Sequence, residues 1–281
     1  MCITFFYISE NPNQDKYKLV LIMNRDEFFK RPTSRCDWKD GILAGRDQVP
    51  GKEGGTWLAI NDKGHIGILT NIYTGIAKPG KGRGFLITDY LKKDNTDDEA
   101  SDNLEEYLKH LALSKVLYSP FNIVFFKPEK DIYKAHYYCR GFQGCFVKDS
   151  IGPEQIEPGF HGLSNHPKKT PYQKTEAGIE KFRNVLETYQ DNENKLIEEL
   201  FKMMKNCTSY YPDEQMINQG GIDSPIKPYH DKLACINVQI PEMGYGTRVS
   251  TLIFVDRDNN VTCVERAHQN NEEDKLFQFK I

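Results

Sequence analysis

A cysteine stands directly behind the initiator methionine, and a charged tetrapeptide, Asn24-Arg25-Asp26-Glu27, follows the second apolar run of the chain. Methionine aminopeptidases remove Met1 when the second residue is small, and cysteine meets that condition. Cys2 would then carry a thiol and a free α-amine on one residue. An α-amine has a pKa of roughly 7.7–8.0, so it is able to accept the thiol proton near neutral pH. The two features predict nucleophilic catalysis or ligand binding at the N-terminus.

The thiol and the charges become neighbours if the first two apolar runs pair as a hairpin. We expect residues 2–8 and 17–23 to be antiparallel strands, with opposed residue numbers that sum to about 25. Cys2 then lies opposite Met23 and beside the tetrapeptide. In this arrangement Arg25 stabilises a thiolate or a substrate carboxylate, and Asp26 holds the α-ammonium or the arginine. The alternative is a buried strand cysteine beside a structural salt-bridge corner.

The rest of the sequence alternates groups of predicted strands with groups of predicted helices. Runs rich in Ile, Val, Phe and Tyr, bounded by turn-forming residues, predict strands at residues 2–8, 18–23, 55–60, 65–70, 121–126, 132–138, 159–163, 233–238, 250–255 and 261–266. Helical periodicity covers residues 84–93, 98–113, 170–189 and 193–204, and residues 190–194 and 211–228 are expected loops. This grouping predicts an α+β protein with antiparallel sheets. No composition shift marks a boundary, so we predict one domain over residues 1–281.

Composition excludes several classes of function. The chain has 281 residues and a formal net charge of -3, which argues against a nucleic-acid partner. No segment approaches the roughly 18 apolar residues of a membrane helix, and no signal or transit peptide is recognisable. Seven cysteines without a Cys-x-x-Cys motif favour free thiols and no structural zinc. We expect six of them to be small, inert apolar residues: Cys36, Cys139, Cys145, Cys207, Cys235 and Cys263.

A basic stretch precedes the helix expected at residues 84–93. Residues 75–81 match the start of a phosphate-binding loop, but Gly82 replaces the Ser or Thr that would bind magnesium. A nucleoside triphosphatase is therefore excluded. Lys78, Lys81 and Arg83 remain candidates for holding an anion, such as a coenzyme A phosphate, at the helix N-terminus. A solvated turn is the favoured alternative.

Several motifs occur together along the chain. They are MCITFF at the start, NRDEF-x-x-RP, GGTWLAI, GRG, the GLSN that ends at Asn165 and the PEMGYGTR that ends at Arg248. Together they resemble the transport and Golgi organisation protein 2 family, also called the NRDE family, from Cys2 to Arg266. That family in turn resembles the cysteine branch of the N-terminal-nucleophile hydrolases, which includes bile-salt hydrolases, penicillin V acylases and acid ceramidase. The resemblance implies a four-layer αββα sandwich of two antiparallel sheets.

The resemblance also implies roles for individual residues. The nucleophile of that branch is the first mature residue, which Cys2 matches. An arginine and an aspartate follow at the end of the second strand, matched by Arg25 and Asp26. The enzymes commonly separate these two by two residues, whereas here they are adjacent. Oxyanion-hole and thiolate-supporting positions are matched by Asn71, Asn165 and Arg248, and Asn24 and Glu27 are expected ligand-binding residues.

Two functions follow from these expectations. The resemblance implies heme trafficking, acyl-coenzyme A and lipid homeostasis, and secretory-pathway organisation, in the cytoplasm, in mitochondria or at the Golgi and endoplasmic reticulum. We interpret the chain as a carrier of a small amphipathic ligand, heme or acyl-coenzyme A, that requires no resident cofactor or metal. The alternative is an amidohydrolase or thioesterase in which Cys2 attacks a carbonyl while Asn71 and Asn165 hold the oxyanion. The sequence leaves the choice of ligand and the oligomeric state open.

Overall fold

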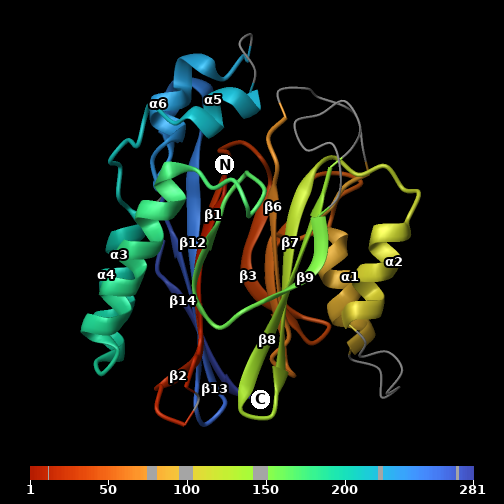
Figure 1. Ribbon diagram of the computed structural model, residues 1–281, viewed down its shortest axis with the longest axis vertical. Helices are drawn as coiled ribbons and strands as arrows, with labels where there is room; N and C mark the ends of the chain where they lie inside the picture. Colours follow the sequence, from red (N-terminus) through yellow and green to blue (C-terminus); the bar gives the residue numbers. More distant parts are fainter. Residues whose placement is uncertain (12, 75–80, 95–103, 142–150, 221–223, 270–271) are drawn as a thin grey trace. The chain divides into compact units, whose positions relative to one another are not determined.

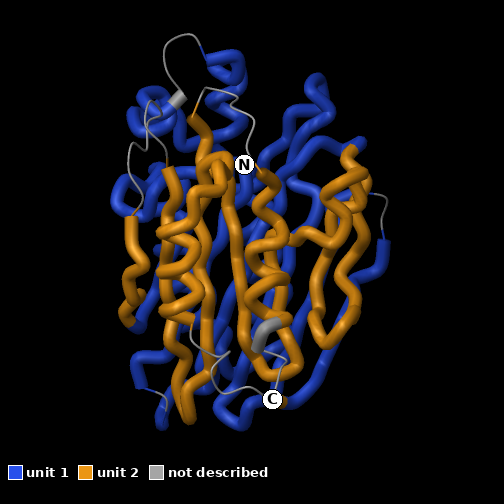
Figure 2. Tube along the Cα trace, turned by 90° about the vertical axis from the view of Figure 1, so that its right-hand side faces the viewer, with its two compact units in different colours: residues 1–30, 158–280 blue, residues 31–157, 281 orange. Residues whose placement is uncertain are grey.

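The computed structural model describes residues 1–281 apart from residues 12, 75–80, 95–103, 142–150, 221–223 and 270–271 (Figure 1). The chain divides into two compact units, which are coloured separately in Figure 2. Unit 1 comprises residues 1–30 and 158–280, and unit 2 comprises residues 31–157 and 281. Each unit has its own antiparallel sheet.

The sheet of unit 1 contains seven strands among the described residues. Its order is β10-β1-β2-β12-β13-β14, and β11 pairs with β12; every pairing is antiparallel. The strands are β1 (Ile3–Ile8), β2 (Tyr17–Phe28), β10 (Gly159–Leu163), β11 (Gln239–Ile240), β12 (Tyr245–Asp256), β13 (Asn260–Ala267) and β14 (Lys275–Lys280). Strands β1, β2 and β12 therefore lie side by side, although β12 is distant in the sequence.

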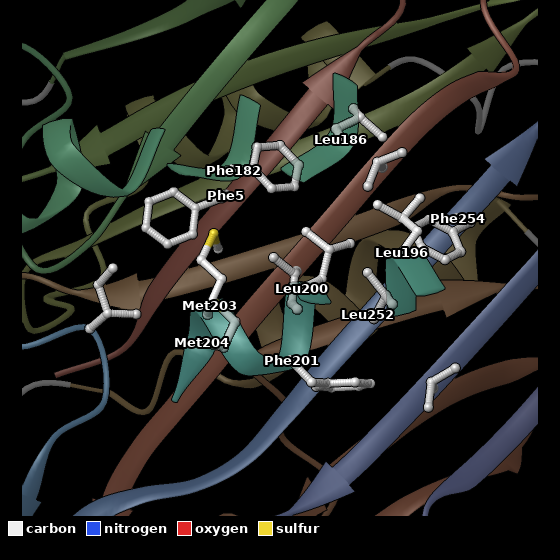
Figure 3. Packing of buried hydrophobic residues seen from close by; sticks show 14 of the residues in the cluster. Phe5, Phe182, Leu186, Leu196, Leu200, Phe201, Met203, Met204, Leu252 and Phe254 are labelled. Carbon is white, nitrogen blue, oxygen red and sulfur yellow. The ribbon is translucent and has the colours of Figure 1, made fainter. Parts of the chain in front are cut away.

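Helices α3 (Gln173–Tyr189) and α4 (Glu193–Met204) pack on this sheet (Figure 3). Buried positions recur at helical spacing along α3, and the side chains of Phe182 and Leu186 contact those of the strands. Burying each large apolar side chain contributes about 1.5–3 kcal/mol to folding. The remaining helical segments of unit 1 are α5 (Glu214–Gly220), α6 (His230–Leu233) and the 3-10 turns η2 (Lys227–Tyr229) and η3 (Pro241–Met243).

The hairpin of β1 and β2 forms as expected but in a different register. Ile3 pairs with Asn24 and Ile8 with Leu19, so opposed residue numbers sum to 27. The expected pairing of Cys2 with Met23 is wrong, because Met23 lies opposite Thr4. The tetrapeptide lies inside β2, and the observed register shifts it by two residues, so that Cys2 is opposite Arg25. Hydrogen bonding to β12 extends β2 through these polar residues.

Unit 2 contains a second antiparallel sheet, which has seven strands in the described part of the chain. They follow one another in sequence order: β3 (Thr33–Lys39), β4 (Ile42–Asp47), β5 (Leu58–Asn61), β6 (Ile66–Asn71), β7 (Phe121–Glu129), β8 (Ile132–Arg140) and β9 (Ile151–Ile156). Helices α1 (Phe85–Asp94) and α2 (Leu104–Leu113) pack on this sheet through a cluster that includes Ile87, Leu108 and Phe125.

The α+β class, with antiparallel sheets and helices, is confirmed. One predicted strand is wrong: residues 233–238 continue from the end of α6 as irregular chain. They are buried because they fill an apolar cluster, and their backbone groups bond to other loops, as Asn237 N does to Asn206 O at 2.9 Å. The expected loop at residues 211–228 contains α5. The single domain predicted over residues 1–281 stays a prediction.

Candidate functional site at the N-terminus

Strands β1, β2 and β12 bring the N-terminus to the charged tetrapeptide. Since Ile3 pairs with Asn24, continuing the antiparallel register places Cys2 opposite Arg25. The Cys2 thiol donates to the main-chain oxygen of Asp26 at 3.8 Å. The expectation that the thiol and the charges are neighbours is therefore confirmed.

Met1 is buried beside this thiol. Only 9% of the residue is exposed, and its side chain packs in an apolar cluster. The other buried members of the Met1 cluster are Tyr172, Met216, Leu233, Ala234, Val238 and Ile240. The Met1 ammonium lies 3.3 Å from Asp26 Oδ2 and donates to the Tyr245 hydroxyl. The folded unit thus holds an amphipathic group by both its apolar and its charged end.

Asp26 is a buried carboxylate, with 5% of the residue exposed. Its Oδ1 accepts from Thr247 Oγ1 at 2.7 Å, while its Oδ2 accepts no other hydrogen bond and faces the Met1 ammonium. Burial raises the pKa of Asp26, and the ammonium and Lys174 act in the opposite direction. A carboxylate in this position depends on a nearby cation to stay ionised.

Lys174 supplies buried positive charge from the first turn of α3. Its ammonium donates to the main-chain oxygens of Leu233 at 2.7 Å and Cys235 at 3.0 Å. Burial lowers the pKa of Lys174, and the charge of Asp26 is the largest influence that raises it. Lys174 therefore ties the Met1 cluster to α3 and compensates part of the Asp26 charge.

Burial raises the pKa of the Cys2 thiol, although the residue keeps some exposed surface. The ammonium of Met1 and Arg25 act to lower this pKa, whereas Asp26 acts with burial to raise it. The thiolate is the nucleophilic form of cysteine. With Met1 in place, the thiol is therefore held in its less reactive, protonated form.

The remaining tetrapeptide residues lie on alternate sides of β2, because successive side chains of a strand point to opposite faces. Asn24 is fully buried; its amide donates to the carbonyl oxygens of Met204 and Ile236, and its Oδ1 accepts from Ser250. These bonds make Asn24 a residue that fixes β2 within unit 1. Arg25, 5% exposed, has Nη2 3.6 Å from Glu27 Oε2.

Arg248 marks an irregularity in β12. Thr247 pairs with Asp26 and Val249 pairs with Arg25, so Arg248 is the extra residue of a β-bulge. Such bulges redirect side chains and are frequent beside functional sites. Arg248 Nη1 donates to Phe28 O at 3.4 Å. The bulge places this guanidinium at the strand end that carries the tetrapeptide.

Ser164 and Asn165 follow β10, the other neighbour of β1. Ser164 Oγ donates to the main-chain oxygen of Cys2 at 2.8 Å and so fixes the residue that carries the thiol. Asn165 is buried, and its main-chain oxygen accepts from Tyr172 and Gln219 side chains. The GLSN motif therefore lies at the candidate site.

Other predicted residues belong to unit 2. Asn71 is exposed at the end of β6, where it pairs with Phe121. Lys81 is exposed, and the guanidinium of Arg83 donates to Pro120 O at 2.9 Å. Lys78 lies outside the described residues, as does Cys145. Among the residues that the structure describes, no group of three or more His, Cys, Asp or Glu side chains is placed to hold a metal ion.

Four residues of this site have no role that the sequence predicts: Tyr245, Thr247, Ser164 and Lys174. The first three lie inside the PEMGYGTR and GLSN motifs, so the sequence indicates their positions but not the residues that they contact. Lys174 is one of two lysines on the helix predicted at residues 170–189, and nothing in its neighbourhood in sequence indicates complete burial. Within the described parts of the chain, no helix is both long and apolar enough to cross a membrane.

Fold and site together define an α+β protein with a cysteine at the second position, held beside a buried carboxylate. The family model described as Transport and Golgi organisation 2 matches residues 1–270, and the chain belongs to this family. The Transport and Golgi organization protein 2 homolog of Homo sapiens is 34% identical over 293 residues, covering 100% of this chain and 99% of the human protein. Transport and Golgi organization protein 2 of Drosophila melanogaster is 30% identical, covering 95% and 92% of the two chains.

Two hydrolases are among the solved structures to which the chain is similar. A Caenorhabditis elegans ortholog of N-acylethanolamine-hydrolyzing acid amidase gives a TM-score of 0.48 at 11% identity, covering 90% of this chain and 92% of that chain. The C2A mutant of conjugated bile acid hydrolase from Clostridium perfringens gives a TM-score of 0.49 at 8% identity, covering 100% and 92%.

Proposed function

We propose that the chain is an intracellular carrier of a small amphipathic ligand, with heme and acyl-coenzyme A as the two candidates. The observation that carries this proposal is the way unit 1 holds Met1. Its apolar side chain is buried in the Met1 cluster while its charged end contacts Asp26 and Tyr245. Removal of Met1 frees this space for the apolar part of a ligand.

The charges around Cys2 favour a ligand that also carries anionic groups. Four cationic groups at this end of the described sheet, the N-terminal ammonium, Arg25, Lys174 and Arg248, outnumber three acidic ones, Asp26, Glu27 and Asp213. Heme propionates and coenzyme A phosphates are both anionic, and an arginine fork matches either group. The family to which the chain belongs is named for transport and Golgi organisation, which supports a carrier with a role at the Golgi, and we propose the cytoplasm and mitochondria as its other locations.

Ligand titration tests the carrier directly. Protein with Met1 removed is titrated with heme and, separately, with a long-chain acyl-coenzyme A. We expect one of them to bind with a Kd near or below micromolar, about -8 kcal/mol. Protein with Met1 retained binds more weakly, because Met1 competes for the apolar cluster. The Arg25→Gln variant is expected to weaken binding, whereas Lys181→Gln, on the exposed face of α3, leaves it unchanged. Failure of both ligands to bind near micromolar concentration contradicts the proposal.

A second candidate, a cysteine amidohydrolase or thioesterase, is favoured by one observation. The buried Asp26 carboxylate already faces an N-terminal ammonium at 3.3 Å. After removal of Met1, Cys2 carries the N-terminal α-amine, and the neutral form of this amine is the base. That amine would accept the thiol proton as sulfur attacks the substrate carbonyl, and would return it to the leaving group. Asn165, which lies in the same unit as Cys2, keeps the predicted role of oxyanion donor.

Acyl transfer to Cys2 distinguishes the two functions. Met1-free protein is incubated with a panel of acyl amides and thioesters, and its intact mass is measured. A hydrolase gives an acyl adduct that maps to Cys2 and is absent from Cys2→Ala. The matched control is Cys207→Ser, which removes an exposed thiol far along the chain and should leave the adduct in place. Binding without any Cys2 adduct supports the carrier and contradicts the hydrolase.

A further inference from the structure

Two segments of unit 1 run side by side next to the Met1 cluster, and each carries a cysteine. Asn237 N donates to Asn206 O at 2.9 Å, and Tyr210 N donates to Ala234 O at 3.1 Å. These hydrogen bonds join the two segments in an antiparallel sense. Cys207 and Cys235 lie between the two bonds, one on each segment. Since Asn206 faces Asn237, Cys207 faces Ile236 and lies one residue along from the position opposite Cys235.

The sulfur of Cys235 already reaches the backbone of its neighbour. Cys235 Sγ donates to the main-chain oxygen of Cys207 at 3.2 Å, while Cys207 Sγ donates to Lys205 O at 3.5 Å. Disulfides join cysteines whose Cα atoms are about 4.4–6.8 Å apart. Since Cys207 Sγ bonds to Lys205 O, the Cys207 side chain must rotate away from Lys205 before the two sulfur atoms can form a disulfide.

The two thiols differ in accessibility. Cys207 is exposed, which differs from the buried apolar role expected from the sequence, whereas Cys235 is only 7% exposed. An exposed thiol meets a soluble oxidant first, and a nearby buried thiol then resolves the adduct. Burial raises the pKa of Cys235, and the charge of Lys174 acts in the opposite direction. Lys174 thus favours the thiolate that the second step needs.

We propose that Cys207 and Cys235 are a modification site that forms a reversible disulfide with a low-molecular-weight disulfide such as oxidised glutathione. The Cys207 thiolate attacks one sulfur of the reagent, whose S–S bond breaks and releases one glutathione thiolate. The Cys235 thiolate then attacks Cys207 Sγ in the mixed disulfide and releases the second. Two protein thiols are oxidised, one glutathione disulfide is reduced to two thiols, and the two thiol protons pass to the released glutathione.

This bond would act on the candidate site through Lys174. The carbonyl of Cys235 is one of the two oxygens that accept from Lys174, and Lys174 lies in the electrostatic field of Asp26. Joining the two segments fixes the position of that carbonyl. The modification therefore couples the redox state of an exposed thiol to the surroundings of the N-terminus.

The experiment uses the full chain, incubated with oxidised glutathione and then analysed by intact mass and peptide mapping. We expect the wild type to lose the mass of two hydrogen atoms, with Cys207 and Cys235 in one linked pair of peptides, and to regain it with dithiothreitol. Cys235→Ala should instead keep a stable glutathione adduct on Cys207, because no resolving thiol is present. Cys207→Ser should form no link to Cys235.

The matched control is Cys263→Ser, which removes a buried thiol in β13 and should leave the linkage intact. A wild type that accumulates a stable glutathione adduct on Cys207 overturns the proposal, because Cys235 then fails to resolve it. A disulfide between either cysteine and a different partner would also overturn the proposal, as would a Cys207 that does not react with oxidised glutathione. Since peptide mapping is applied to the wild type as well as the variants, a misfolded variant does not decide the outcome.

Discussion

Asp26 and Lys174 are the residues on which the N-terminal arrangement depends. Both are buried and carry opposite charges, and each bonds to groups that would be costly to leave without a partner. Breaking a buried pair by removing one member leaves an uncompensated charge, whereas surface charges contribute little. Substitutions at these two positions should therefore have much larger effects than substitutions of exposed charges on the same elements.

The first prediction concerns the pH dependence that Asp26 causes. Burial raises its folded-state pKa, so the folded chain retains the proton at a higher pH than the unfolded chain does. Its contribution to stability is full below about pH 4, the unfolded pKa, and is lost as the pH rises through the folded pKa. The wild type should therefore lose stability relative to Asp26→Asn over this range, by about 1.4 kcal/mol for each unit of pKa difference.

Urea unfolding of both proteins between pH 4 and pH 8 measures this difference. The window begins near the reference pKa of aspartate, about 3.9. Asparagine keeps an acceptor for Thr247, so the comparison isolates the charge. Asp258→Asn, in the exposed turn before β13, serves as the control and should follow the wild-type profile. Parallel pH profiles for wild type and Asp26→Asn would show that the buried carboxylate does not titrate differently in the two states.

The second prediction compares two lysines of α3. Lys174→Met removes the donor from the carbonyls of Leu233 and Cys235 and the cation from Asp26. We expect a loss of about 3 kcal/mol or more in the free energy of unfolding. Lys181→Met, on the exposed face of the same helix, should change it by less than about 0.5 kcal/mol. Equal effects in urea unfolding would contradict the role assigned to Lys174.

At this scale the sequence could mark positions but not contacts. Residue type and the expected hairpin indicate Cys2, Arg25 and Asp26, and the structure brings these residues together although the register of the hairpin differs by two. Local pattern alone does not determine that register, because the loop between the strands and the pairing with β12 also constrain it. The burial of Lys174 depends on α6 and the loop after it, whose carbonyl oxygens accept from its ammonium, and a pattern of helical spacing does not contain these segments.

The elements that position Cys2 pack closely at one point, where α3 crosses β1. A Cβ added at Gly178 would lie 2.2 Å from the Phe5 ring, closer than any side chain tolerates. The third prediction is that Gly178→Ala destabilises the protein by about 1–3 kcal/mol, although alanine favours a helix by about 1 kcal/mol. Since β1 leads directly to Cys2, alkylation of that thiol should also accelerate.

Urea unfolding and the rate of Cys2 alkylation, followed by peptide mapping, check this prediction. Glu180→Ala adds the same side chain at an exposed position of α3 and should be neutral or slightly stabilising. A Gly178→Ala variant as stable as Glu180→Ala would mean that α3 and β1 separate easily. The contact between them would then have no part in holding the N-terminal strand.

Elements with a strong local pattern were predicted well. Helix α4 spans Glu193–Met204 as expected, with Asn192 capping it through a bond to Lys195 N, and β10 also has the expected bounds. Strands β3, β4, β9, β11 and β14 were not predicted. Strands β3 and β9 consist largely of polar residues that are at least partly exposed, so they lack a buried apolar run. Residues 233–238 are apolar for a different reason, since they fill the Met1 cluster without joining the sheet as a strand.

At the scale of the whole molecule, the chain leaves unit 1 after residue 30 and returns to it at residue 158. The hairpin that carries Cys2 is therefore completed by β10 and β12, which are made much later in synthesis. Composition could not predict this division, because both units consist of antiparallel sheet and helices with similar residue types. Contacts between segments distant in sequence, not local pattern, decide which strand lies beside β1 and β2.

The last prediction follows from that order of synthesis and from the burial of Met1. An aminopeptidase must hold the first residue in its own active site, but the folded chain encloses the Met1 side chain and binds its ammonium. Removal should therefore occur before β12 and the loop after α6 have folded around the N-terminus. In a chain prepared with Met1 retained, an added methionine aminopeptidase should act only after local opening.

Intact mass followed over time measures the rate of Met1 removal. An opening free energy of about 3 kcal/mol would make the folded protein react about 100-fold more slowly than a peptide with the same first residues. Met216→Ala, which creates a cavity in the Met1 cluster, should accelerate the removal of Met1. Met23→Ala creates a cavity outside that cluster and should not accelerate removal by loosening it. Equal rates for folded protein and peptide would show that Met1 is not held as described, and the proposed competition between Met1 and a ligand would lose its basis.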